Sequence, residues 1–145
     1  MEKQMKLMNQ LVADLAVNFV KFHNLHWNVV GERFKEVHEY AEELYDMINE
    51  QYDEVAERMK MLGSFPAAQL KTYLELSNVE EIEDRDYQIP EVFKILKEEL
   101  EKLRDLGTEI RTLADDSGDF ATVAMLEDMI IAYDKEIWFM EQALK

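Results

Sequence analysis

Long stretches without glycine or proline constrain this chain more than any other feature. Only four glycines and two prolines interrupt 145 residues, and most of the rest are helix-forming types such as Glu, Lys, Leu, Met and Ala. Between these breaks, apolar residues recur at steps of three and four, which is the period of an amphipathic α-helix. The sequence therefore predicts an all-α protein built from a few long helices.

Four segments carry this pattern over enough residues to form long helices. The first runs from Glu2 to about Val29 and the second from Arg33 to Leu62, and each is followed by a glycine. The third starts at Pro90, a favoured first residue of a helix, and continues to about Leu113. The fourth runs from Phe120 to the C-terminus. The two pairs of neighbouring helices are expected to form hairpins.

The segment from Ser64 to Pro90 joins the two predicted hairpins and differs from the rest of the chain. It has weak periodicity, contains both prolines and carries an acidic run at residues 80–84. We interpret it as a long crossover, in which Ala67–Leu76 forms a short extra helix. Residues 1–145 are thus expected to form one domain, a four-helix bundle with the connectivity of ferritin-like bundles.

Charge and cysteine content limit the chemistry that is open to this chain. Thirty-two acidic against 16 basic residues give a net charge of −16, which favours cations over nucleic acids as partners. Because the chain has no cysteine, any metal must be bound by His, Asp or Glu, a ligand set that suits iron, manganese or zinc.

The N-terminus lacks the apolar core of a signal peptide, and no run approaches the roughly 20 apolar residues of a membrane span. A cytoplasmic location is expected.

Two pairs of candidate ligands lie on the second predicted helix. His38 and Glu42 are four residues apart, as are Asp53 and Glu57, so each pair projects from adjacent turns of one face. At 100° per residue all four fall on one stripe of the helix. The two pairs are nevertheless about 22 Å apart along the helix axis, at 1.5 Å per residue, and no single ion spans that distance.

An antiparallel dimer would bring the two pairs together. If the second helix packs against its own copy across a two-fold axis near Met47 and Ile48, position 38 lies level with position 57. Each pair of one chain would then meet the other pair of the second chain, which gives two equivalent sites. His26, across the Gly31 turn from His38, could supply a second imidazole to each site. Two imidazoles and three carboxylates suit one or two iron ions.

A structural role for the same stripe is the alternative. In a chain with 32 acidic residues, Asp or Glu four apart often lie on a solvated helix face, so either pair alone is weak support for a metal site. The stripe could serve dimer packing, or bind zinc in place of iron without turnover. The protein would then be a non-catalytic metal-binding or interaction bundle.

The motif His26-Trp27-Asn28-Val29-Val30-Gly31 resembles the Dps family of bacterial mini-ferritins. Further matching residues follow it on the second helix and continue into the last: Phe34, Val37-His38-Glu39, Leu44-Tyr45, Asp53-Glu54-Val55-Ala56-Glu57-Arg58, Ser117-Gly118-Asp119 and Ile137-Trp138. The resemblance covers nearly the whole chain.

This resemblance implies a hollow shell of twelve subunits that protects against oxidative damage. Iron is oxidised at sites on the two-fold interfaces, with hydrogen peroxide preferred to dioxygen, and is stored as a ferric mineral. Residue by residue, the resemblance implies that the iron ligands are His26, His38, Asp53 and Glu57. Glu42 stands where the family usually has Asp. Family members that compact DNA carry a Lys-rich tail, which this chain lacks, so direct DNA binding is not expected.

The sequence also suggests roles for four residues that are not candidate ligands. Asp119 and Asp128, near the start of the last helix, are candidates for a pore through which iron enters the shell. Trp27, next to the ligand His26, is expected to pack at the end of its helix rather than to scavenge oxidising equivalents. His23, one turn before His26, is expected to be structural rather than a hydrogen-bond partner of the site.

Overall fold

The computed structural model describes all residues, 1–145. It contains five helices and two very short strands, in the order α1 (Glu2–Asn28), β1 (Val29–Val30), α2 (Phe34–Met61), α3 (Leu70–Leu76), β2 (Tyr87–Gln88), α4 (Ile89–Asp116) and α5 (Phe120–Leu144). None of the helices is long and apolar enough to cross a membrane. The predicted all-α architecture with four long helices and one short helix is confirmed.

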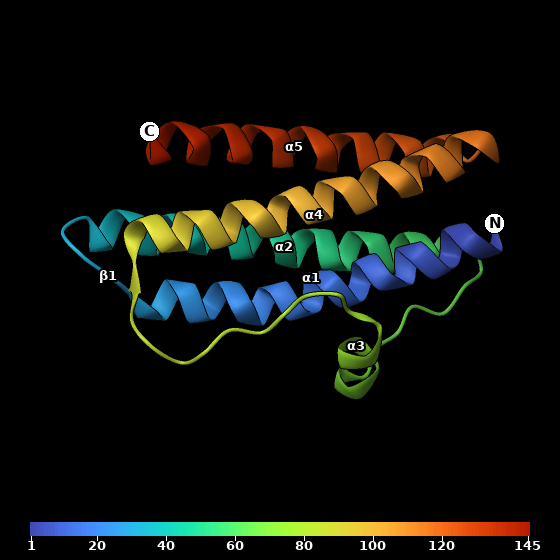
Figure 1. Cartoon of the computed structure of the whole chain (residues 1–145). Coiled ribbons are helices and arrows are strands. Elements are labelled where there is room, and N and C mark those ends of the chain that lie inside the picture. Colours follow the sequence, from blue (N-terminus) through green and yellow to red (C-terminus); the bar gives the residue numbers. More distant parts are fainter.

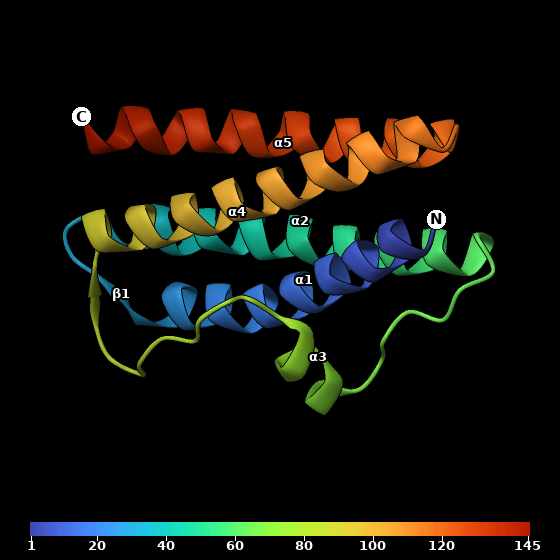
Figure 2. The ribbon, with the colours of Figure 1, turned by 45° about the vertical axis from the view of Figure 1, so that its right-hand side comes forward.

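The four long helices form two hairpins that pack side by side (Figure 1). α1 pairs with α2, and α4 pairs with α5, while α1 also packs against α4. The crossover leaves the end of α2 and returns along the whole length of the bundle to the start of α4 (Figure 2). α3 lies in this crossover, outside the bundle and against α1. The connectivity is therefore that of the predicted two hairpins with one long crossover.

A continuous apolar core fills the space between the helices. It contains 27 buried residues, most of them on the four long helices, among them Leu11, Leu15, Phe22, Leu44, Ile48, Leu96, Leu100 and Leu126. The Tyr133 hydroxyl, fully buried on α5, donates a hydrogen bond of 2.6 Å to Oε1 of Gln51 on α2. Because both polar groups are satisfied inside the core, this bond fixes the packing of α5 on α2 without an unpaired buried atom.

Three features of the connections differ from the prediction. α4 is longer than expected, from Ile89 to Asp116, and α3 starts at Leu70 rather than Ala67. The amide of Ala67 donates to Oδ1 of Asn9 at 2.7 Å, which ties that residue to α1 outside the helix. The third feature is a parallel pair of two-residue strands, in which Val29 pairs with Tyr87. This pair fastens the end of the crossover to the turn between α1 and α2.

Gly31 makes this turn possible. Its φ of +132° is rarely adopted by residues with a side chain, and an added Cβ would lie 3.2 Å from Cδ1 of Ile89. The turn therefore requires glycine for both backbone and steric reasons.

Gly31→Ala should lower the free energy of unfolding by about 1–3 kcal/mol, because the turn would be strained. Gly107→Ala is the matched control, since Gly107 lies inside α4 and an added Cβ would meet Ile130 at an ordinary 3.8 Å. That change should raise stability by about 0.5–1 kcal/mol. Denaturant unfolding of both variants measures the difference, and equal stability of Gly31→Ala and the unmodified chain would contradict this role for the turn.

Candidate metal centre

His26 and His38 face each other across the turn between α1 and α2. Nδ1 of His26 lies 2.6 Å from the carbonyl oxygen of His38, and Nδ1 of His38 lies 2.7 Å from the carbonyl oxygen of His26. The two rings stack with centroids 3.7 Å apart and planes 15° apart. Two helices are thus joined by a reciprocal pair of hydrogen bonds.

These hydrogen bonds determine where each imidazole carries its proton. A carbonyl oxygen can only accept, so both Nδ1 atoms must donate. In the neutral imidazole the lone pair is then on Nε2, the atom left free to bind a metal. Both histidines are therefore held in the tautomer and orientation of a metal ligand.

Glu42 completes this half of the site on the next turn of α2. Its Oε1 lies 3.8 Å from Nε2 of His26, and its side chain is 53% exposed. His26 is buried and His38 half-buried, with the ring of Phe34 stacked near His38 at 5.2 Å. The Glu42 carboxylate thus lies at the surface of the chain, while the two imidazoles are less exposed.

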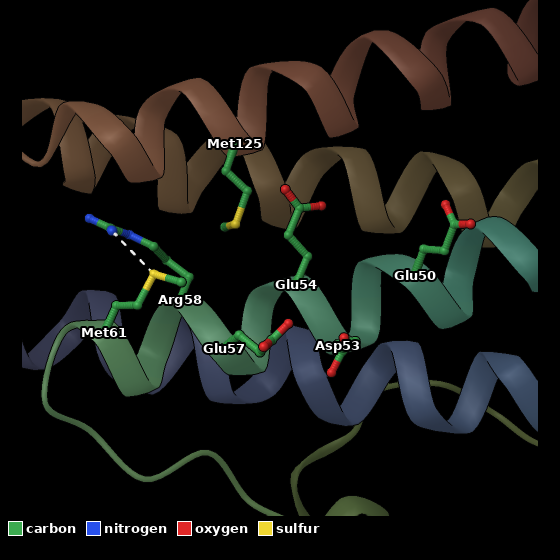
Figure 3. Close-up of a pocket in the computed structure, with 7 residues that line it drawn as sticks. All are labelled: Glu50, Asp53, Glu54, Glu57, Arg58, Met61 and Met125. Carbon is green, nitrogen blue, oxygen red and sulfur yellow. Dashed lines mark hydrogen bonds between the residues drawn. The ribbon is translucent and has the colours of Figure 1, made fainter.

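Asp53 and Glu57 form the second half, further along α2. Figure 3 shows their carboxylates on one side of the helix, while Glu50 and Glu54 project from another. A hydrogen bond to Asp53 and repulsion from its charge raise the pKa of Glu57. The carboxylates of Asp53 and Glu57 are therefore close together, and both are exposed. Two neighbouring negative charges favour a bound cation. Asp53 and Glu57 line a surface pocket of ≈ 260 Å³ together with Glu50, Glu54, Arg58, Met61 and Met125.

Within one chain the two halves do not meet. No group of three or more His, Asp or Glu side chains is close enough to hold a metal ion. The structure brings His26, His38 and Glu42 together at one end of α2, and Asp53 with Glu57 at the other. A metal site built from all five residues therefore needs a second copy of the chain, which remains a prediction.

Roles were predicted for two residues beside the site, His23 and Trp27. His23 is held by its own helix, with Nδ1 2.6 Å from the carbonyl oxygen of Phe19, and its ring stacks on Tyr45 at 3.8 Å. This is the structural role that was expected. Trp27 is 68% exposed and lies outside the core, and it packs only at the end of its own helix, with its ring 5.4 Å from that of His23. One residue past His26, it points about 100° away around the helix and so faces solvent.

The two pore candidates differ in their surroundings. Asp128 is exposed on α5. Asp119 caps the N-terminus of α5 and accepts hydrogen bonds from Arg58 at 2.7 Å and Gln4 at 2.8 Å, as well as from Thr122. Burial raises the pKa of Asp119, but these hydrogen bonds outweigh it and bring the pKa to about 2. Asp119 therefore has a structural role, and the pore assignment of both residues stays a prediction.

Comparison with known proteins shows the family to which this chain belongs. A family model described as a ferritin-like domain matches residues 5–145. The DNA protection during starvation protein of Helicobacter pylori is 33% identical over 98% of this chain and 99% of its own, and that of Listeria innocua is 38% identical over 96% and 90%. The crystal structure of antigen TpF1 from Treponema pallidum has a TM-score of 0.97 at 34% identity and covers 99% of this chain and 92% of its own.

The chain thus belongs to the ferritin-like family. Within that family it is a Dps-like mini-ferritin, as the relatives that match it over nearly its full length establish.

Asp119→Ala should lower the free energy of unfolding by about 1–2 kcal/mol at pH 7, since the helix cap is lost. The folded-state pKa of about 2 lies below the ordinary value of 3.8, so the stabilisation is present above pH 4 and is lost as the pH falls toward 2. Unfolding at several pH values should therefore show the gap between the two proteins closing in acid. Asp128→Ala is the exposed control, and a gap for Asp119→Ala that is independent of pH would contradict the assignment.

Proposed function

We propose that this protein is a ferroxidase whose sites are each shared between two copies of the chain. In an antiparallel pair of α2 helices, His26, His38 and Glu42 of one copy would face Asp53 and Glu57 of the other. The observation that carries the proposal is the reciprocal hydrogen bonding of the histidines, which leaves both Nε2 atoms free, with that of His26 beside the Glu42 carboxylate.

The residues suit ferrous iron as substrate. Neutral imidazoles and deprotonated carboxylates are ligands for Fe²⁺, and a set of five leaves positions for an oxidant. With hydrogen peroxide, two Fe²⁺ each lose one electron, and the O–O bond breaks to give two hydroxide ions. Because both electrons reach the same peroxide, no hydroxyl radical is released. Dioxygen is the alternative oxidant.

Storage of the ferric product in an oligomeric shell completes the proposed function. Membership of the Dps-like mini-ferritins supports iron storage and self-association. We propose a shell of twelve subunits, located in the cytoplasm, in which oxidised iron is held as mineral. Asp119 and Asp128 remain the proposed lining of its iron entry pore. Removal of iron and peroxide together would protect the cell from oxidative damage.

Anaerobic loading with Fe²⁺, followed by one peroxide per two irons, tests this function. Ferric absorbance should rise much faster than in buffer, and spin trapping should detect little hydroxyl radical. His38→Ala and Asp53→Ala should each slow oxidation by about 10- to 100-fold, because each removes a ligand from every site.

Glu39→Ala is the matched control, since Glu39 is an exposed neighbour of His38 that pairs only with Lys35 at 3.8 Å. It should oxidise iron at the unmodified rate. Equal rates for all three variants would show that the stripe is structural.

Zinc that binds to this stripe while iron oxidation stays at the buffer rate would favour the non-catalytic alternative. A solved Dps from Listeria innocua was soaked with zinc, which makes zinc a suitable probe.

Protection of DNA is proposed to be indirect. The chain carries a net charge of −16, so its overall charge repels the phosphate backbone. A gel-shift assay at low salt, where electrostatic binding is strongest, should show no retardation of duplex DNA. A shift that disappears with added salt would instead support direct binding.

A further inference from the structure

Two exposed apolar side chains stand at the two ends of α2, next to the candidate ligands. Phe34 is the first residue of the helix and lies four residues before His38, while Met61 is the last and lies four residues after Glu57. Phe34 is 42% exposed and Met61 is 73% exposed. Large apolar residues beside functional groups are candidates for an interface. The five proposed ligands include neither of them.

Phe34 already covers a candidate ligand within the single chain. Its ring lies 5.2 Å from the ring of His38, with the two planes 25° apart. His38 in turn stacks on His26 at 3.7 Å, so the His38 ring contacts both neighbours. A phenyl ring binds no metal ion, and it therefore shields His38 with an apolar surface.

Little holds the Met61 side chain in place. Figure 3 shows it beside the side chain of Arg58, one turn beyond Glu57. The sulfur accepts a hydrogen bond from Nη1 of Arg58 that is 3.9 Å long, and a thioether is a weak acceptor. Methionine has three rotatable bonds, and its sulfur makes favourable contacts with aromatic rings. An aromatic ring within reach would therefore be a suitable partner for Met61.

The dimer that would join the ligands also brings these two residues together. Positions 34 and 61 share the midpoint of positions 38 and 57, so they lie level in the same antiparallel pair. Each copy offers two rows with a step of four residues: Phe34, His38 and Glu42, and Asp53, Glu57 and Met61. In the commonest packing of two helices, at about −50°, the four-residue rows of both helices interdigitate. Phe34 of one copy then lies beside Met61 of the other.

We propose that Phe34 of one copy and Met61 of the other form an apolar lid over each iron site, at the end farther from the two-fold axis. The proposal rests on the ferroxidase function. One electron from Fe²⁺ splits peroxide into a hydroxide ion and a hydroxyl radical, and an electron from a second Fe²⁺ reduces the radical to hydroxide. The lid would keep the peroxide and its fragments at the irons until both electrons have been transferred.

Cysteine cross-linking tests the contact without iron. The chain has no cysteine of its own, so Phe34→Cys together with Met61→Cys introduces the only two thiols. Within one chain, positions 34 and 61 are about 40 Å apart along α2, at 1.5 Å per residue, which is too far for a disulfide. Mild oxidation of the assembled double variant should give covalent dimers on a non-reducing gel. Either single variant should stay monomeric on the same gel.

Three results would overturn the lid. The double variant would give no covalent dimer, or it would form a ladder of larger species, which indicates a contact that does not close between two copies. Covalent dimers of a single variant would place like positions together and contradict the antiparallel register.

Radical release tests what the lid does. Met61→Gln keeps the length of the side chain but makes it polar, while Met61→Leu keeps it apolar without sulfur. After loading with Fe²⁺ and peroxide, the hydroxyl radical trapped per iron oxidised should rise at least about twofold in Met61→Gln and stay at the unmodified level in Met61→Leu. An unchanged yield in Met61→Gln would overturn the lid. An equal rise in both variants would also overturn it, because the sulfur rather than the apolar cover would then matter.

Failure of the ferroxidase function and failure of the lid give different results. If the function is wrong, the unmodified protein oxidises iron at the buffer rate, and the lid is wrong with it even where the cross-link forms. If only the lid is wrong, iron oxidation is fast, but the cross-link is missing or the radical yield of Met61→Gln is unchanged.

Discussion

The candidate centre depends on the two hydrogen bonds by which His26 and His38 each donate to the other's backbone. The carbonyl of His26 lies in the last turn of α1, where carbonyls lack partners within the helix. The bond from His38 therefore satisfies this carbonyl while it orients the imidazole. Because Gly31 and the β1–β2 pair set the path of the turn, the single chain already fixes the relative position of the two histidines.

The separation of the candidate ligands between the two ends of α2 would link metal binding to assembly. The His-rich half carries little charge, whereas Asp53 and Glu57 repel each other and gain from a nearby cation. In the single chain the three carboxylates are exposed, whereas His26 is buried and His38 half-buried. In the proposed dimer, each copy supplies what the other lacks, so iron and the partner chain would stabilise each other.

The long helices could be predicted from the sequence because their apolar residues repeat over about seven turns. The His38–Glu42 and Asp53–Glu57 spacings likewise indicated two ligand pairs on one face. The short strands could not be predicted, since two residues have no periodicity and Tyr87 pairs with Val29 only through the fold. The tautomer of the histidines and the exposed position of Trp27 also depend on how the turn is closed, which spacing alone does not specify.

Mixed assemblies test the shared site most directly. His38→Ala and Asp53→Ala subunits are each expected to be inactive alone, but in a mixed dimer the intact histidine half of one chain meets the intact acidic half of the other. Unfolding the two variants together in equal amounts and reassembling them should restore about a quarter of the sites, because half of the dimers are mixed and one of their two sites is complete. Peroxide-driven oxidation should recover to about that fraction. Recovery no greater than in the separate variants would contradict a site shared between subunits.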